Sequence, residues 1–600
     1  MITDLNRIIK KIHNYIYAND GLDNYEVLDV LLKIFYIKTY DEVNECIIEK
    51  SKTEKDLLAN TLKVFANLIK NYPQLFEKNA VIGLKDETLL YVMKELKEVE
   101  ISKESSDVKG HLMQRIIDRS FREGRGQFFT PAQVVDFIVK MIDPKPTQKG
   151  CDPACGTGGF MFSALESMAQ KDGDISKVVN NVDFYDISKS VTKLITMRLM
   201  FEFSIDKPNI KIQDSISSDI PAIYDFVLTN PPFGSQGRIT DKKILSKYSL
   251  GCDENGKLYS SQVPDILFVE KVLSILKNGG KGAVVLPDGN FENPSSQYFR
   301  EYLFSHAKID AIISLPDGTF IPYGTGVKSS IIFFTKEKIT SDYDVFFGKI
   351  NNLGYTFSKH SKPLLDRAGK IIEDYSDVIN CFKNKKYNDD NFLIKASSII
   401  KNNYSLAYHY YSPRINKTIQ KYVGNSNITV GSMTIAKSKR TKIDPDKTYK
   451  YVEISDVNAT GCEIINCTEM LGSDLPSRAS FTLSENELIV AVAGNAIGTV
   501  WNTKAIVTKE YDGCICTNGF IVLDVLNTSP YLLLHFFNSE AFRVQVRKFR
   551  YGTAIPTITK DDFLNIVVPD YSEEKKKEII SNMQKAFKLK AEAKILLQME

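Results

Sequence analysis

Hydrophobic and polar positions follow three different patterns along the 600-residue chain. From residue 1 to about 110, apolar side chains recur every three or four positions, as at Ile8, Ile12 and Ile16, which predicts amphipathic helices. Between 150 and 335, short β-branched runs alternate with helical patterns, which predicts a doubly wound α/β sheet. After 401, β-branched runs separated by turn residues predict a mixed, β-rich domain. We therefore expect a helical domain at 1–110, an α/β domain at 111–400, a β-rich domain at 401–571 and a closing helix at 572–600.

Acidic residues end three consecutive predicted strands, at Asp152, Asp186 and Asp214. A glycine-rich bend (156–159) follows the first one and opens a helix near Phe160, so backbone can approach a ligand closely. The bend lacks P-loop spacing, and the Asp152 carboxylate would repel a pyrophosphate. A cationic ligand such as S-adenosylmethionine fits better, with Asp186 placed for ribose hydroxyls and Asp214 for an adenine amine. Each aspartate alone is also a common turn residue or helix cap.

A fourth predicted strand, at 224–228, ends in the corner Asn230-Pro231-Pro232-Phe233. Prolines restrict the backbone and donate no hydrogen bond, so this corner is stiff. The Asn230 side-chain oxygen and the Pro231 carbonyl can each accept one N–H of an exocyclic amine, while Phe233 stacks on the ring. The alternative is a proline-rich turn with a buried asparagine.

Two further segments flank these strand ends. Phe129-Thr130-Pro131 precedes an apolar helical pattern, where Thr130 can cap the helix and Pro131 can occupy its first turn. A plain helix cap is the alternative reading of this segment. The polar stretch 234–262 is long for a connection in a compact domain, and beside the corner it can close over a substrate.

Composition and charge exclude several classes of protein. With 43% apolar and 25% charged residues the chain is an ordinary globular protein, and its net charge of +3 means that any basic surface is local. Charged residues among the first twenty and the lack of an apolar run of 18 residues exclude a signal peptide and a membrane span. Nine scattered cysteines and six histidines indicate reduced cytosolic thiols and no metal site.

Two basic clusters lie in the β-rich part of the chain. The first cluster consists of Lys437, Lys439, Arg440 and Lys442, and the second of Arg543, Arg547, Lys548 and Arg550, leading into Tyr551. Cations close to an aromatic ring suit contact with DNA phosphates and bases. A solvated protein face is an equally compatible interpretation of each cluster.

Taken in order, these motifs resemble the modification subunit of Type I restriction systems, an adenine-N6 DNA methyltransferase of the gamma class. The matching pieces cover about 1–400 and are 127–131, 152–160, Asp186, Asp214, 230–233 and Phe268. Less specific signals at 487–491, 494–500 and 551–558 resemble one target-recognition unit of a Type I specificity subunit, followed by a helix. The chain thus resembles a fused protein with one recognition unit instead of two. It shows no helicase or nuclease motif.

The resemblance implies an S-adenosylmethionine-dependent methyltransferase sheet preceded by a helical domain and followed by a target-recognition domain and a helix. The implied catalytic residues are Asn230, Pro231, Pro232 and Phe233. The implied cofactor-binding residues are Phe129, Thr130, Pro131, Asp152, Pro153, Ala154, Gly156, Thr157, Gly158, Gly159, Phe160, Asp186, Ile187, Asp214, Ser215, Asn230 and Phe268. The implied partner is double-stranded DNA, contacted by the two basic clusters and Tyr551, in the bacterial cytoplasm at the nucleoid.

The implied reaction is transfer of a methyl group to an adenine amine that has left the duplex stack. Two acceptors on the amine free its nitrogen lone pair, and no strong general base is needed because the methylated amine becomes acidic. Two other classes remain open. The same corner also serves amide nitrogens, which would make the chain an RNA or protein-glutamine methyltransferase. A non-catalytic DNA-binding subunit with a relic cofactor site is the second.

The closing helix carries an apolar seam of Ile580, Met583 and Phe587. This seam can pack on its own chain, meet a second copy in a two-fold dimer, or bind a separate specificity or restriction subunit. We expect the dimer or the separate subunit. A dimer favours a palindromic, interrupted DNA target, and a monomer favours a short asymmetric one.

Overall fold

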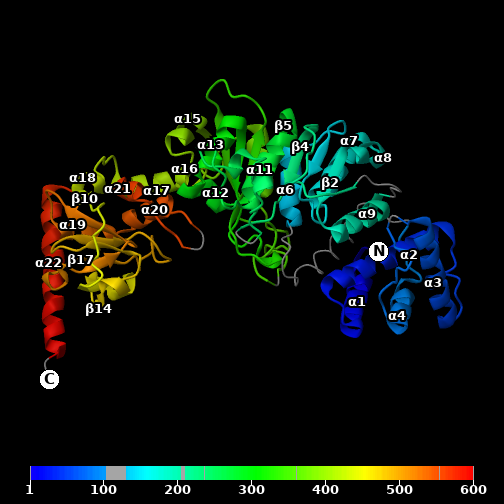
Figure 1. Ribbon diagram of the computed structural model, residues 1–600, viewed down its shortest axis with the longest axis horizontal. Coiled ribbons are helices and arrows are strands. Elements are labelled where there is room, and N and C mark those ends of the chain that lie inside the picture. The colour runs from blue at the N-terminus through cyan, green and yellow to red at the C-terminus, as the bar shows by residue number, and fades with distance from the viewer. Residues whose placement is uncertain are drawn as a thin grey trace. The chain divides into compact units, whose positions relative to one another are not determined.

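The structure is a computed structural model and describes residues 2–73, 75–102, 130–203, 210–234, 237–359, 361–552 and 555–598. The chain forms two compact units (Figure 1). The first unit comprises Met1–Asn290, Tyr298–Tyr387 and Leu393–Ser398, and the second comprises Phe291–Gln297, Asn388–Phe392 and Ile399–Glu600. Among the described residues, no helix has both the length and the apolar character needed to cross a bilayer.

Four long helices open the first unit: α1 (Ile2–Asp20), α2 (Asn24–Asn44), α3 (Glu54–Asn71) and α4 (Asp86–Leu96). Capping boxes begin α2 at Asp23 and α3 at Thr53, where each side-chain oxygen accepts an amide hydrogen of the first turn. The apolar faces of these helices form one core, which also includes Leu194 and Met200 of the later helix α9 (Lys189–Phe203). The helical bundle therefore packs on the helix that follows the second strand of the sheet.

The predicted doubly wound sheet is confirmed. In the described residues it has nine strands in the order β3-β2-β1-β4-β5-β7-β6-β8-β9, and β1 to β5 run parallel. The strands are β1 (Gly150–Asp152), β2 (Val182–Asp186), β3 (Ile210–Ile212), β4 (Tyr224–Thr229), β5 (Leu276–Pro287), β6 (Lys308–Ser314), β7 (Ser329–Thr335), β8 (Asp344–Lys349) and β9 (Phe392–Lys395). The chain moves outward from β1 to β3 and then returns to β4 on the other side of β1. The topological switch point, where open α/β sheets bind ligands, therefore lies between β1 and β4.

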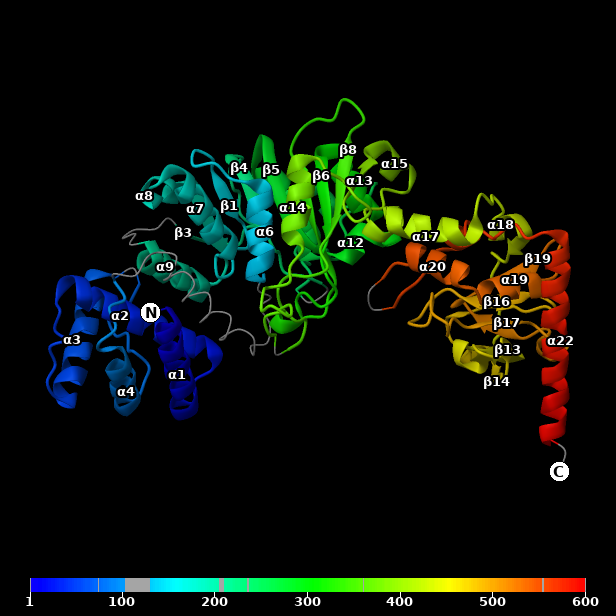
Figure 2. The same cartoon turned by 180° about the vertical axis from the view of Figure 1, so that it is seen from behind.

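Helices cover both faces of this sheet. On one face, α6 (Ala132–Ile142), α7 (Gly159–Asp172) and α14 (Tyr375–Asn384) share a core with Phe184, Phe226 and Val285 of the strands (Figure 2). On the other face, α11 (Pro264–Ile275) packs on β5 (Figure 1). The remaining helices are α8 (Ile175–Val178), α10 (Lys242–Leu245), α12 (Asp288–Glu292), α13 (Gln297–His306) and α15 (Ala396–Lys401).

The second unit contains two four-stranded sheets, β10-β19-β16-β17 and β14-β11-β18-β15, and a hairpin, β12-β13, among its described residues. The strands are β10 (Thr434–Ala436), β11 (Thr448–Val452), β12 (Val457–Asn458), β13 (Glu463–Ile464), β14 (Thr468–Leu471), β15 (Ala479–Thr482), β16 (Leu488–Ala491), β17 (Lys504–Ile506), β18 (Ile515–Thr517) and β19 (Phe520–Val525). Its helices are α16 (Tyr408–Tyr411), α17 (Pro413–Val423), α18 (Val430–Met433), α19 (Pro530–Phe537), α20 (Glu540–Phe549), α21 (Lys560–Leu564) and α22 (Glu573–Gln598). One core joins both sheets to α19 and α20.

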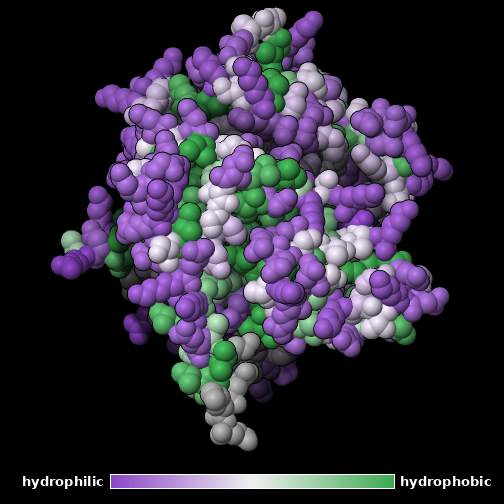
Figure 3. All heavy atoms as spheres, turned by 90° about the vertical axis from the view of Figure 1, so that its left-hand side faces the viewer, coloured by the Kyte–Doolittle hydropathy of each residue, from purple (hydrophilic) through white to green (hydrophobic). Residues whose placement is uncertain are grey.

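The first half of α22 packs on its own unit. The Phe587 ring lies edge-to-face with Tyr531 at 5.4 Å between centroids, and Met583 contacts the same core. These two seam side chains are therefore covered by the chain itself, as in the first of the three arrangements considered above. The second half of α22 exposes Leu589, Ile595 and Leu596. The side of the molecule that carries α22 is otherwise mostly hydrophilic, with apolar side chains scattered among charged ones (Figure 3).

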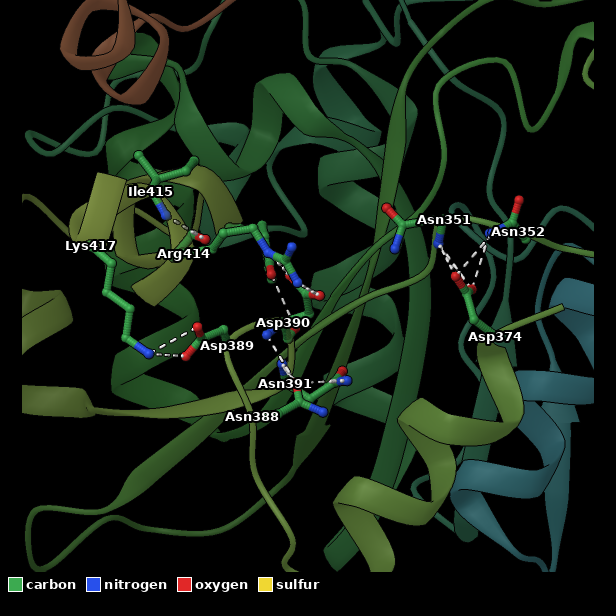
Figure 4. Close-up of polar contacts among 12 residues, drawn as sticks. Asn351, Asn352, Asp374, Asn388, Asp389, Asp390, Asn391, Arg414, Ile415 and Lys417 are labelled. Carbon is green, nitrogen blue, oxygen red and sulfur yellow. Dashed lines mark hydrogen bonds and ion pairs between the residues drawn. The ribbon is translucent and has the colours of Figure 1, made fainter. Parts of the chain in front are cut away.

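Ion pairs hold the short segment Asn388–Phe392 to α17 within the second unit (Figure 4). Lys417 Nζ lies 2.7 Å from a carboxylate oxygen of Asp389, and Arg414 pairs with Asp390. In the first unit, the Asp374 carboxylate accepts the backbone amides of Asn351 and Asn352, each at 3.0 Å (Figure 4). The Asp374 carboxylate thus ties the start of α14 to the residues after β8.

Candidate active site

Three of the predicted site residues end neighbouring strands of the first unit. Asp152 is the last residue of β1, Asp186 is the last of β2, and Asn230 directly follows β4. Because these strands are parallel and adjacent, their carboxyl ends meet at one edge of the sheet, at the switch point.

The glycine-rich bend after β1 is tied to the end of β2. The Gly156 amide donates to Asp186 Oδ2 at 3.1 Å, and the Cys155 amide donates to the Tyr185 carbonyl at 3.0 Å. Gly158 begins α7 with a φ of +84°, and a Cβ there would lie 2.7 Å from the Phe162 ring. Glycine is therefore required at 158 for both backbone conformation and space.

Burial opposes the ionisation of two carboxyl groups at this edge of the sheet, Asp152 and Asp186. Burial raises the pKa of Asp152 to about 7, and the nearby charge of Asp186 adds to the effect, while a hydrogen bond from the Ala154 amide opposes it. Burial also raises the pKa of Asp186, against hydrogen bonds from the amides of Ser188 and Gly156. A cation between these groups would favour both charged forms, so the pocket is suited to a positively charged ligand.

The other predicted cofactor residues differ in exposure. Asp214, after β3, accepts the Ile216 amide at 3.0 Å, and the buried Ser215 hydroxyl has no hydrogen-bond partner among the described residues. Ile187 is 72% exposed directly after Asp186, where it forms an apolar rim. Pro153, Thr157, Phe160 and Phe268 are buried, Ala154 and Gly159 are half-buried, and Phe129 lies outside the described residues.

Asn230 is oriented by Thr130, which lies just before the start of α6. Its amide Nδ2 donates to Thr130 Oγ1 at 2.9 Å, although the two residues are 100 positions apart. This hydrogen bond turns Asn230 Oδ1 the other way, and that buried oxygen has no partner among the described residues. Buried acceptors are normally satisfied, so the orphaned oxygen marks a place for an N–H donor.

Thr130 does not cap the helix, contrary to the expectation from sequence. The helix α6 begins at Ala132 with Pro131 as its N-cap residue, and no side chain caps it. The Thr130 hydroxyl is instead engaged by Asn230. The buried Pro131 carbonyl accepts the amides of Val134 and Val135, which secures the turn that presents Thr130.

The aromatic ring of the corner is largely covered. Phe233 is 8% exposed and lies edge-to-face with Phe320, 6.0 Å between centroids. Pro231 is buried and Pro232 is exposed. The corner thus combines the buried Pro231 and Phe233 with the exposed Pro232.

The family model for N-6 DNA methylases matches residues 105–418. The chain belongs to the N-6 DNA methylase family. It is 27% identical over 337 residues to the Type I restriction enzyme EcoEI methylase subunit of Escherichia coli, covering 54% of this chain and 66% of that protein. It is 26% identical over 259 residues to the StySJI methylase subunit of Salmonella typhimurium, covering 40% of this chain and 46% of that protein. The chain therefore spans about half to two thirds of the length of these curated relatives.

Solved structures share the fold of this N-6 DNA methylase. The methyltransferase subunit of a Type I restriction-modification system from Streptococcus thermophilus matches with a TM-score of 0.51 at 18% identity. The match covers 69% of this chain and 100% of that one. The type IIG restriction endonuclease BpuSI matches with a TM-score of 0.51 at 14% identity, over 97% of this chain and 74% of that one. The second match extends the likeness in fold across both units.

The stretch after the corner of this methylase is folded, not an open loop. Residues 237–262 contain α10, and backbone bridges join Ile239 to Gln262 and Cys252 to Leu258. The buried Glu270 of α11 accepts the amides of Ser249 and Leu250, each at 2.8 Å. The segment is therefore fastened beside the corner in the described structure.

Sequence reasoning missed a buried ion pair behind the glycine-rich bend. Arg198 of α9 donates to the Thr157 carbonyl at 2.8 Å and to Glu202 at 2.6 Å, and its guanidinium lies 3.8 Å from the Phe162 ring centre. Both charged side chains are at most 2% exposed. The signal in the sequence is an Arg and a Glu four positions apart in the mostly apolar second half of this helix, 197–203. Arg198 therefore fixes the backbone of the bend from within.

The two predicted basic clusters have different surroundings in this methylase. In the first, Lys439, Arg440 and Lys442 are exposed and have no hydrogen bond or ion pair with another described residue, whereas Lys437 pairs with Glu487 at 2.7 Å. In the second, Arg543 and Arg547 both pair with Glu540.

The second cluster also makes contacts within its own unit. Arg547 donates to the Gly498 carbonyl at 2.9 Å, and Arg550 donates to the Ile497 carbonyl at 3.4 Å. Lys548 donates to Asn416 at 2.7 Å, and burial lowers its pKa. These four cations are engaged by groups of their own unit. Of the two clusters, only the first therefore has cations without a partner among the described residues. The described residues contain no group of three or more His, Cys, Asp or Glu arranged to hold a metal ion.

Proposed function

We propose that this chain is a DNA adenine-N6 methyltransferase of a restriction-modification system, which methylates a flipped-out adenine with S-adenosylmethionine. The observation that carries the proposal is the buried Asn230 Oδ1, which lacks a hydrogen-bond donor at the switch point. An exocyclic amine is a donor of the required kind, and the acidic pocket lies at the end of the neighbouring strands. Membership of the N-6 DNA methylase family supports the same reaction.

The residues of the pocket fit S-adenosylmethionine. Asp152 and Asp186 supply carboxylates for the cationic methionine part and the ribose hydroxyls, and the glycine-rich bend leaves room for close approach. The exposed Ile187 and the half-buried Asp214 would contact the adenine ring and its amine. When bound, this cofactor supplies the electrophilic methyl group. The raised pKa of Asp152 indicates that the pocket is poised to take up positive charge.

The residues of the corner act on the target amine. Asn230 Oδ1 and the Pro231 carbonyl accept its two hydrogens, which leaves the nitrogen lone pair free. Thr130 keeps the amide oxygen, and not its NH₂ group, directed at the substrate. Extruding the base costs a few kcal/mol, which the hydrogen bonds and stacking on Phe233 offset. Most of the rate then comes from positioning and electrostatics.

We further propose the domain assignment 1–110 helical, 111–400 catalytic, 401–571 target recognition and 572–600 closing helix. The two sheets and separate core of the second unit support a recognition module, as do its open cations Lys439, Arg440 and Lys442. The resemblance of this part to a specificity subunit makes the chain a fused methyltransferase that acts on bacterial DNA in the cytoplasm. A homodimer, or a separate specificity or restriction subunit, would contact the second half of α22.

Methyl incorporation tests the function directly. Purified full-length protein is incubated with S-adenosylmethionine labelled in its methyl group and with DNA, RNA or protein from a host that lacks the gene. We expect label in DNA only, and N6-methyladenine after digestion. Label in RNA or in protein glutamine would identify one of the alternative methyltransferases. No label in any substrate, with cofactor binding intact by calorimetry, would identify a non-catalytic subunit.

A further inference from the structure

Trp501, the only tryptophan of the chain, is on the surface of the second unit. Its side chain is 62% exposed, and the neighbouring Val500 is 60% exposed. Trp501 makes no ring-stacking or cation–π contact with any residue that the structure describes. Exposing two adjacent large apolar side chains on a folded domain is unfavourable, so their exposure calls for a ligand that covers them.

Hydrogen bonds within the loop and buried residues on both sides of it hold the loop that carries Trp501 in place. The Trp501 amide donates to Thr499 Oγ1 at 3.1 Å, and Thr499 Oγ1 donates to the Ala496 carbonyl at 2.7 Å. On both sides the loop is anchored by Ile497 and Asn502, which are at most 1% exposed. Because the ring is already held in position, binding of a ligand to it costs this loop little conformational entropy.

The second basic cluster supports this loop. Arg547 donates to the Gly498 carbonyl and Arg550 to the Ile497 carbonyl. A Cβ at Gly498 would lie 2.9 Å from the Arg547 side chain, so the contact is close. The positive side chains that sequence suggested for phosphate contact thus hold the Trp501 loop from behind.

Topology places the Trp501 loop at the same sheet edge as the open cations. Strands β10 and β16 flank β19 and both run antiparallel to it, so both end at one edge of the sheet. The segment 437–443, with Lys439, Arg440 and Lys442, leaves that edge from β10, and the loop 492–503 leaves it from β16. Residues 555–557 also reach this edge, because the Gly494 amide donates to the Pro556 carbonyl at 2.9 Å.

The charged side chains within these segments are all positive, while the Glu292 carboxylate accepts the Gly552 amide at 2.9 Å. The segments 437–443, 492–503 and 551–557 contain no aspartate or glutamate. A rigid indole at the same sheet edge as three open cations is complementary to DNA, which offers phosphates and, where a base leaves the duplex stack, a flat base face.

We propose that Trp501 is a DNA-contact residue of the second unit: its indole ring stacks on a base of the bound DNA, while Lys439, Arg440 and Lys442 contact phosphates. This inference rests on the proposed function, because it takes DNA as the substrate. It adds the sheet edge and the side chain through which the second unit engages a base.

The single tryptophan allows a direct test. Intrinsic fluorescence of the full-length protein is followed during titration with unmethylated plasmid DNA, and binding is measured separately by anisotropy of fluorescein-labelled fragments of that DNA. We expect quenching that saturates together with the anisotropy, since a stacked base quenches indole emission. Trp501→Ala should weaken DNA binding about tenfold, and Trp501→Phe, which keeps an aromatic face, should recover most of that loss.

Ile465→Ala provides the matched control, because Ile465 is a 55% exposed apolar residue of the second unit that lies outside these segments and outside α22. It should leave binding unchanged, and all variants should keep the wild-type circular dichroism and thermal midpoint. DNA binding with unchanged emission and an unchanged affinity of Trp501→Ala would overturn the inference and leave the proposed function intact. A blue shift that depends on protein concentration without DNA would identify a protein contact instead. Absence of both DNA binding and DNA methylation would overturn the two together.

Discussion

The functional edges of the two units are built in opposite ways. At the switch point of the first unit, the polar side chains are buried or half-buried and hydrogen-bonded within the unit, as Asn230 is to Thr130 and Asp186 is to the Gly156 amide. One acceptor oxygen is left open for chemistry. At the edge of the four-stranded sheet, the open groups are a ring and three cations on the surface.

The difference shows what each edge must supply. Methyl transfer requires a reacting atom to be placed to within a fraction of an ångström, so the corner is stiff and internally bonded. Under the proposed function, the second edge recognises a long, charged partner, which requires reach and charge, and the exposed Lys439, Arg440 and Lys442, unpaired with any described residue, suit that role. Substitutions should therefore change turnover at the first edge and affinity at the second.

The largest effect is expected at the corner. Asn230→Ala removes the open acceptor and should lower methyl transfer about 100- to 1,000-fold or more, while S-adenosylmethionine binds almost normally. Label transfer to DNA measures the first quantity and calorimetry the second. Near-normal turnover in this variant would remove Asn230 from the catalytic residues.

The orienting residue should have a smaller effect of the same kind. Thr130→Val keeps the volume but loses the hydroxyl that fixes the Asn230 amide, so kcat should fall about tenfold with little change in cofactor affinity. Thr130→Ser, which keeps the hydroxyl, should retain most of the activity. If Thr130→Val weakened cofactor binding and left kcat unchanged, Thr130 would be a cofactor residue, as the sequence alone suggests.

Local constraints explain which of these features were predictable. The corner could be placed from sequence because two prolines fix it within four residues, and the aspartates because each ends a strand. The Thr130–Asn230 contact spans 100 residues, and no local pattern encodes it. The second basic cluster was assigned to DNA because sequence shows the charges but not the carbonyls of Ile497 and Gly498 that bind them.

Two glycines at opposite ends of α7 offer a matched pair for the cofactor pocket. Both have positive φ, +84° at Gly158 and +82° at Gly173, but an added Cβ meets the Phe162 ring at 2.7 Å only at the first. Gly173→Ala should cost about 1–2 kcal/mol of stability from backbone conformation and leave cofactor affinity unchanged. Gly158→Ala should cost more and weaken cofactor binding about tenfold, from the displaced bend.

Because the pKa of Asp152 is raised, both the stability of the folded protein and its affinity for the cofactor should depend on pH. The folded-state value of about 7 lies above the ordinary 3.8, so the folded protein binds more protons than the unfolded chain in that interval. Without cofactor, the free energy of unfolding should therefore fall as pH rises from 4 to 7. Affinity for the cationic cofactor should rise over the upper part of the same range, by at most about tenfold per pH unit.

Asp152→Asn distinguishes this group from the other acids. Asparagine at position 152 cannot ionise. In this variant, the free energy of unfolding and the cofactor affinity should therefore both change much less with pH than in the wild type. Its cofactor affinity should be weaker than that of the wild type at pH 8 and similar at low pH. An unchanged slope in the variant would assign the titration to another group, with Asp186 the first candidate because burial also raises its pKa.

The smallest effects per residue are expected at the recognition edge, where they separate the two basic clusters. Each of Lys439→Ala, Arg440→Ala and Lys442→Ala removes an open cation, so affinity for DNA should fall only a fewfold. The slope of log K against log salt should become shallower by about 0.9 per cation. Arg547→Gln should leave that slope unchanged, because Arg547 is paired with Glu540 and holds the Gly498 carbonyl. Its cost should appear in thermal stability and in the tryptophan response to DNA. A salt slope lowered by Arg547→Gln and unaffected by the three lysine and arginine variants would reverse the roles of the clusters, and the DNA path would then run along α20.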